Sequence, residues 1–551
     1  ALLIALTLLG DAWLSLRQVW QAAVARGQGS GEAPVWPLGS SLALCLAVAL
    51  IGVGLLFVMP MAHAALVWPV LGLGFLWVAL KLAHPALSLM WAALTAASAL
   101  TFLVFGPAIW APLPVAELPL PWPGLTGGLA WWTPLVLAVC TVLAGDWLQA
   151  DARRNSGWRM SWVSSGAVQV GMVGWSLVWW WLTLLPEVSR ELQLMHLTAW
   201  WPACVALWVT VTAALMVWVA HARQWRLMGQ ASALAIPGWY WAALLGPAFS
   251  PLPPSADLGW LAWPLALCCG PWLLRRLQAW LDDSALRHLH VLGFWLMAAL
   301  LCRQAQWATD QWATPGSGWQ SLCWILVPAS LVLLVSSPRA AARWPLRDFA
   351  QSYRVAGALP LVAGLVLWLL HSLVSSGRAQ PLPYVPVLNP LELGQCLVVL
   401  TLVMWVRELP ASIQAQLPEG RTRLAALGGL AWLVITTMVL RACHHWADVP
   451  WDASALFQSK LTQASLSVVW ALLGVGLMIR GHRQVQRAVW VAGAGLLGVV
   501  VGKLFFLELA DHGGLYRIIS FIVVGLLLLV VGYFAPVPPD QAAERAESEV
   551  P

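Results

Sequence analysis

Four ionisable side chains lie close together in an otherwise apolar stretch, VVGKLFFLELADHGGLYRIISF, residues 500–521. They are Lys503, Glu508, Asp511 and Arg517. Ionisable residues within a membrane-length apolar segment are costly, and they are therefore candidates for function. Their chemistry suits three roles: anchors at helix ends, a structural network of ion pairs, or a site that handles a charged substrate or ion.

Lys503 is the deepest of these groups. It follows the start of its predicted span by about 15 residues, which is roughly 22 Å of helix, and from there a lysine can extend its ammonium group toward the headgroups. Lys503 and Glu508 are five residues apart, so they are not a local helical pair. A partner for Lys503 must come from the turn that contains Glu508 and Asp511 or from across the bundle. The best distant candidate is Glu392, in NPLELGQ, which we expect on the same outer side of the membrane. We favour a structural ion network over simple anchoring, and anchoring over a substrate or ion site.

A second polar group lies in ACHHWADVPWD, which contains His444, His445, Asp448 and Asp452. Two imidazoles and two carboxylates are metal ligands by type, but their spacing matches no standard zinc site. We therefore predict a hydrated interfacial loop, with His444 and His445 as binding candidates. No metal, cofactor or catalytic residue is predicted.

The composition places these groups in a membrane protein. Of 551 residues, 60% are hydrophobic and 9% are charged, and the mean hydropathy is +0.77, whereas a soluble domain carries about 25% charged residues. The net charge of +6 is dispersed among loops, which argues against nucleic acid as a partner. The 41 tryptophans favour interfacial belts and helix packing over a groove for a glycan or lipid.

A span needs about 20 mostly apolar residues, and on that rule the fold class is all-α, a polytopic helical membrane protein with about 15–17 spans in this stretch. The candidates are residues 1–18, 39–59, 62–80, 85–105, 126–145, 162–185, 197–220, 231–249, 258–274, 288–303, 317–336, 353–375, 389–407, 424–442, 460–479, 488–509 and 516–534. Arginines gather in alternate loops, which predicts that those loops and the C-terminus are cytoplasmic.

Three regions are expected along the chain. Residues 1–120 hold spans that continue from a missing N-terminal part, since the chain opens inside an apolar stretch. Residues 121–535 form the main helical region, and residues 536–551 a disordered cytoplasmic tail, because they are polar and contain prolines.

Three segments together resemble a known family. They are VLNPLELGQCL (387–397), the run from LRACHHWADVPW to SKLTQASLSVVWALLG (440–474), and KLFFLELADHGGLYRIISFIVVGLLLLVVGYFAPVPP (503–539). They are similar to the C-terminal half of the bacterial predicted membrane proteins called domain of unknown function 2339, and a looser likeness reaches back to about residue 120. The resemblance implies a very long multi-span protein of the bacterial cytoplasmic membrane, with a coiled-coil-like segment and further helices at its start. It implies no activity for any residue.

The expected function is that of a non-enzymatic inner-membrane protein of the cell envelope, a scaffold or a carrier for a lipid-linked or amphiphilic molecule. Its expected partners are membrane lipids, such a ligand, and a membrane or periplasmic protein. One alternative is a transferase acting on a lipid-linked sugar at the outer face, with Glu392, Glu508, Asp511 and His444 as its acid–base candidates. Another is an ion- or proton-coupled transporter that uses Lys503 and Glu392.

Overall fold

The computed structural model describes residues 38–59, 61–82, 84–109, 132–153, 166–249, 252–418 and 420–503, with scattered residues before 22 and after 517. Every long element in these ranges is a helix, and they contain no strand. The all-α fold class predicted from the sequence is confirmed.

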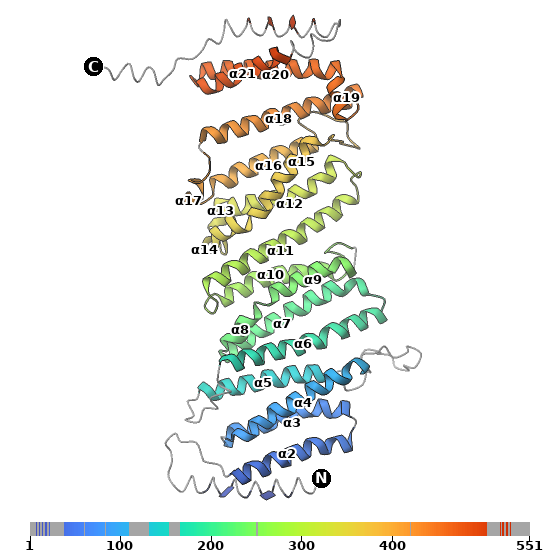
Figure 1. The fold of residues 1–551 in the computed structure, drawn as a ribbon, viewed down its shortest axis with the longest axis vertical. Coiled ribbons are helices and arrows are strands. Elements are labelled where there is room, and N and C mark those ends of the chain that lie inside the picture. Colours follow the sequence, from blue (N-terminus) through green and yellow to red (C-terminus); the bar gives the residue numbers. More distant parts are fainter. Residues whose placement is uncertain are drawn as a thin grey trace, which may run out of the picture. The chain divides into compact units, whose positions relative to one another are not determined.

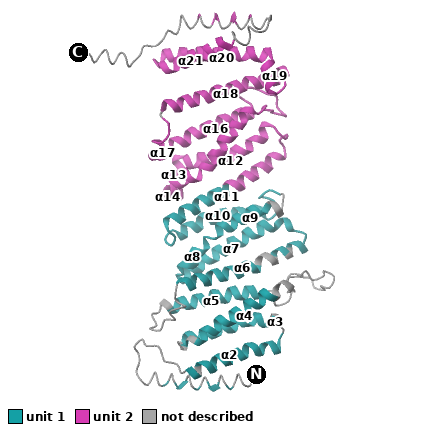
Figure 2. Cartoon of the chain, viewed as in Figure 1, with its two compact units in different colours: residues 1–297 teal, residues 298–551 magenta. Residues whose placement is uncertain are grey.

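The chain divides into two compact units, Ala1–Met297 and Ala298–Pro551 (Figure 2). Unit 1 contains α2 (Leu38–Val58), α3 (Met61–Leu82), α4 (Pro85–Ile109), α5 (Thr133–Arg153), α6 (Gly166–Leu194), η4 (Thr198–Trp200), α7 (Trp201–Arg223), α8 (Arg226–Ser232), α9 (Ala235–Phe249), α10 (Gly259–Leu277) and the first half of α11 (Asp283–Asp310). Within it, α3 packs on α4 and α5, α5 packs on α6, and α7 packs on α8, α9 and α10.

Unit 2 contains the rest of α11 and the helices α12 (Gly318–Ser336), α13 (Pro338–Ala341), α14 (Leu346–Gln351), η5 (Ser352–Gly357), α15 (Leu359–Val374), α16 (Pro390–Arg407), α17 (Ala411–Gln414), α18 (Gly420–Ala447), α19 (Ala453–Gln458), α20 (Lys460–Arg483) and α21 (Arg487–Lys503). Here α12 packs on α15 and α16, and α20 packs on α18 and α21. The short helices α13, α14 and α17 lie at one end of the long helices and α19 lies at the other (Figure 1).

Fifteen of the predicted spans, from 39–59 to 488–509, correspond to helices of this structure. The fit is close for residues 39–59 against α2, whereas the span predicted at 126–145 is displaced toward the C-terminus in α5. Ten helices of the described ranges are long and apolar enough to cross a membrane, or eleven with the pair Leu346–Gly357 and Leu359–Val374, which is bent by 40°. The predicted spans 1–18 and 516–534 lie almost wholly outside the described residues.

The surfaces of these helices are apolar. Phe57 on α2 is 83% exposed, Leu244 on α9 is 74% exposed and Leu367 on α15 is 68% exposed. Exposing such side chains to water costs free energy, whereas in a bilayer they contact lipid chains. A helix is also suited to a bilayer because its backbone groups are hydrogen-bonded internally. The most exposed of these helices is α18, whose residues 420–429 all lie at the surface.

The contact between α20 and α21 depends on glycine. A Cβ atom added to Gly493 would lie 2.6 Å from the carbonyl oxygen of Gly474, and one added to Gly474 would lie 3.1 Å from that of Gly493. Small residues let membrane helices approach this closely. The segment GAGLLG at 493–498 has the glycine spacing of a dinucleotide-binding turn, but it lies inside the helix α21 and therefore serves helix packing.

We predict that Gly493→Ala destabilises unit 2 by about 1–3 kcal/mol, the usual cost of overpacking, because the added methyl group meets backbone that cannot move aside. Gly495→Ala is the matched control on the same helix, since its added Cβ meets nothing within 4 Å. Thermal unfolding in detergent measures both variants. Equal melting temperatures would contradict the close contact.

Candidate functional site

Glu392 lies in the first turn of α16 and is 3% exposed. Its carboxylate accepts a hydrogen bond from the Tyr384 hydroxyl at 2.6 Å and another from the Val387 backbone N–H at 2.5 Å. The N-terminus of a helix favours a negative charge, and Asn389 caps the same helix end by accepting from Leu391 N at 2.8 Å. Both carboxylate oxygens of Glu392 are therefore bonded.

Arg441 of α18 supplies the opposite charge and is 0% exposed. One of its terminal nitrogens lies 3.5 Å from Glu392 Oε1, an ion-pair distance. Its Nε donates to Ser375 O at 3.0 Å, and the other terminal nitrogen donates to Ser372 O at 2.5 Å. These carbonyls belong to the C-terminal end of α15, which lacks internal donors and favours a cation.

We call Glu392, Arg441 and Tyr384 the polar clamp. It joins the end of α15, the start of α16 and the last third of α18. Burial and the bond to Glu392 raise the pKa of the Tyr384 phenol above its ordinary value, so this group stays a hydrogen-bond donor. Gly377 has a φ of +69°, and a Cβ atom there would lie 2.9 Å from the Arg441 side chain. The loop backbone is thus shaped around the arginine.

Lys503 does not meet Glu392. Its ammonium group donates to Gln463 O at 2.5 Å and to Ser467 Oγ at 2.7 Å, both on α20, and lies 6.0 Å from the centre of the Trp470 ring. The expected pairing with Glu392 is therefore wrong, because Arg441 pairs with that carboxylate. Glu508, Asp511 and Arg517 lie outside the described residues.

His444 and His445 are half-buried at the end of α18, with ring centres 4.6 Å apart. His444 Nδ1 lies 2.7 Å from Val449 O and His445 Nε2 lies 2.9 Å from Ser376 O, so each ring donates to a carbonyl. His445 also stacks on Tyr384 at 4.7 Å. His445 thus packs against the polar clamp, and His444 packs against His445 and Trp451.

Asp452 lies in the connection between α18 and α19 and caps α19. Its carboxylate accepts from Ser454 N at 3.0 Å and from Ala455 N at 3.2 Å, and also from the Ser454 hydroxyl. These bonds lower the pKa of Asp452, the Ser454 hydroxyl contributing most. Among the described residues, no three histidine, cysteine, aspartate or glutamate side chains are placed to hold a metal ion.

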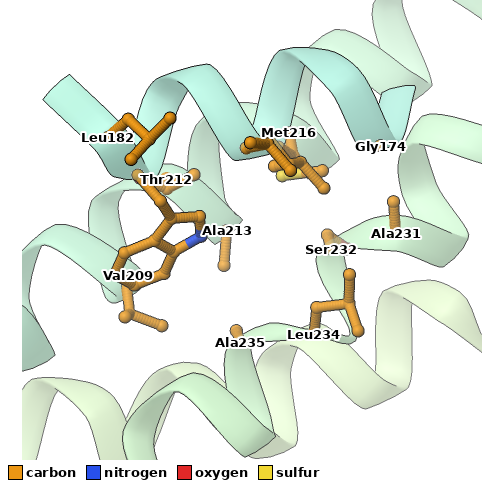
Figure 3. A pocket seen from close by; sticks show the side chains of 13 residues that line it. Gly174, Leu182, Val209, Thr212, Ala213, Met216, Ala231, Ser232, Leu234 and Ala235 are labelled. Atoms are coloured by element: carbon orange, nitrogen blue, oxygen red, sulfur yellow. The ribbon is translucent and has the colours of Figure 1, made fainter. Parts of the chain in front are cut away.

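A different kind of site lies in unit 1, in an apolar opening between α6, α7, the end of α8 and the start of α9 (Figure 3). We call it the first cleft; it has a volume of about 450 Å³. Its lining residues are Gly174, Leu177, Val178, Trp181, Leu182, Val209, Thr212, Ala213, Met216, Ala231, Ser232, Leu234 and Ala235. The two hydroxyl groups are engaged, since Thr212 accepts from Trp180 Nε1 at 3.0 Å and Ser232 donates to Gly229 O at 2.6 Å.

The run Trp179–Trp181 divides its side chains between packing and this opening. Trp179 is buried against Phe102 with ring centres 5.6 Å apart, and Trp180 stacks on Trp208 at 4.7 Å. Trp181 lines the first cleft. The predicted role in helix packing therefore fits Trp179 and Trp180, although Trp180, like Trp181, also lines an apolar opening.

The sequence predicted a role for Glu392 but none for Arg441 or Tyr384. A signal for Arg441 was present, because it is an arginine inside an apolar span at the end where the neighbouring loops are poor in arginine. Nothing in the sequence pointed to the first cleft, whose lining residues are those of an ordinary apolar helix.

A family model described as "Predicted membrane protein (DUF2339)" matches residues 192–538. The chain belongs to this family. The match contains the polar clamp, and it begins within α6, so the looser likeness back to about residue 120 stays a prediction. No curated protein and no solved structure matches the chain.

We predict that Glu392→Gln destabilises unit 2 by about 3–5 kcal/mol, because it leaves the buried Arg441 charge unpaired. The control is Glu408→Gln, which breaks the more exposed pair with Arg354, a 3.3 Å contact, and should cost at most about 1 kcal/mol. Thermal unfolding of the two variants in detergent should separate them. A loss as small for Glu392→Gln as for the control would refute a clamp role.

We also predict an acid-sensitive cap at α19. The lowered pKa of Asp452 means that its contribution to stability is present above the ordinary carboxyl pKa of 3.8 and is lost as the pH falls through the folded-state pKa. Backbone amide protection over residues 453–458, corrected for intrinsic exchange, should fall between about pH 7 and about pH 2 in the native protein. Asp452→Asn keeps a capping oxygen and should remove this dependence; an unchanged pH response would exclude the carboxylate.

Proposed function

We propose that the chain is a non-catalytic, multi-span protein of the bacterial cytoplasmic membrane that holds a lipid-linked or amphiphilic cell-envelope molecule by its hydrocarbon part. The observation that carries this proposal is the first cleft, an apolar opening beside α7, which is long and apolar enough to cross a membrane. In this reading the C-terminus lies in the cytoplasm, as the alternation of arginine-rich loops predicts.

The depth of the first cleft favours a hydrocarbon occupant. Val209 and Met216 lie roughly 12 Å and 22 Å along α7 from Trp201, and the hydrocarbon core is about 30 Å thick. The cleft then lies near the middle of the bilayer, where acyl or isoprenoid chains are found. Its engaged hydroxyl groups suit such a chain better than a headgroup.

The polar clamp weighs against the two alternatives. A general acid or base must reach a substrate, whereas Glu392 has both oxygens bonded inside the protein and is 3% exposed. A transporter that uses Lys503 with Glu392 would need these groups together, and they have different partners. The clamp is better suited to holding helices α15, α16 and α18 together.

We predict that Gly174→Leu expels the bound molecule. A Cβ atom at Gly174 meets nothing within 4 Å, so the leucine has room to occupy the first cleft. If the leucine displaces about two methylene groups of the bound lipid from the cleft, binding loses about 1.6 kcal/mol. The affinity for the lipid, and with it the amount that co-purifies, should then fall by about tenfold or more. Native mass spectrometry of the protein released from nanodiscs gives the bound fraction.

Gly171→Leu is the matched control, because it makes the same replacement in α6 at an exposed position where an added Cβ also meets open space. This variant should retain the lipid. The proposal is wrong if Gly174→Leu retains as much lipid as Gly171→Leu while both variants melt like the native protein.

A further inference from the structure

A second cleft, of about 220 Å³, lies between α5, α6, α7 and α8. It shares Leu177, Thr212 and Met216 with the first cleft, so the two openings adjoin along one seam between α6 and α7. The other lining residues of the two clefts differ. On α6, for example, Val178 lines the first cleft and Ser176 lines the second.

The seam is held in place by internal contacts. Trp180 lines the second cleft, stacks on Trp208 at 4.7 Å and donates to the Thr212 hydroxyl at 3.0 Å. Ser176 donates to Val173 O at 2.9 Å. None of the described residues that line either cleft is charged, so the second cleft also suits a hydrocarbon chain.

From this arrangement we infer that the bound molecule carries two hydrocarbon chains, one in each cleft, on either side of the seam formed by Leu177, Thr212 and Met216. The inference rests on the proposed function and names the class of molecule, a two-chain lipid. Because Leu177, Thr212 and Met216 line both clefts, the two occupants lie on either side of the same three side chains, and two chains joined at one headgroup can straddle them. A single molecule gains both contacts for one loss of translational freedom.

The test blocks each cleft separately in the full-length protein. Gly174→Leu fills the first cleft, and Leu215→Trp enlarges a side chain that lines the second and is 49% exposed. Val211→Trp is the control for the second, since it lies one turn away on α7, is 54% exposed and lines neither cleft. The probe is a diacyl phosphatidylglycerol, titrated into delipidated protein and followed by native mass spectrometry.

Blocking either cleft should weaken diacyl binding by about tenfold or more, and Val211→Trp should leave it unchanged. With native protein, the corresponding one-chain lysolipid should displace the diacyl lipid and bind with two molecules per site. This second measurement does not depend on the folding of any variant.

Two results would overturn the inference and leave the proposed function intact: normal diacyl binding by Leu215→Trp, or saturation of the native protein by one lysolipid. The inference would also be wrong if the native protein binds two diacyl lipids independently and each variant loses one of them. If Gly174→Leu has no effect either, the proposed function fails as well.

Discussion

The buried ion pair between Glu392 and Arg441 constrains the part of unit 2 around it. A charge removed from water must be paired and hydrogen-bonded, and here each partner also satisfies a helix end. Arg441 binds the last carbonyls of α15, and Glu392 lies where the N-terminus of α16 favours an anion. Tyr384 and His445 then pack on the pair. The connection between α15 and α16 is therefore held by electrostatics, although the helices around it are apolar.

Membrane helices have no hydrophobic drive to associate in lipid, and two places in this chain show how differently such helices can pack. Unit 2 uses polar contacts across helices and close glycine contacts, as between Gly474 and Gly493. In unit 1, α6 and α7 meet along a narrow seam at Leu177 and leave apolar space beside it. Apolar space of this kind inside a bilayer suits the hydrocarbon chain of a lipid or ligand.

Much of the fold could be predicted from the sequence, because a span is fixed by length and hydropathy alone. The structure therefore has helices where spans were predicted, as with residues 39–59 and α2. A helix end differed where the helix continues beyond its apolar part, as α5 does through Asp146–Arg153. The polar clamp and the clefts were harder to predict than the helices. The importance of Glu392 followed from its burial cost, but its partner depends on which helix lies opposite, and Arg441 resembled a helix-end anchor. The clefts depend on how far α6 diverges from α7, which no local pattern records.

The position of the polar clamp on α18 has a mechanical consequence. This helix has 28 residues, or about 42 Å of length, which exceeds a hydrocarbon core of about 30 Å. Residues 420–429, at the end far from Arg441, are all exposed. A helix longer than its bilayer relieves the mismatch by tilting or by adjusting its ends. Because α18 is held at the clamp and also at Trp432 and Thr436, which contact Trp470 of α20, the exposed residues 420–429 are the part that adjusts to the thickness of the membrane.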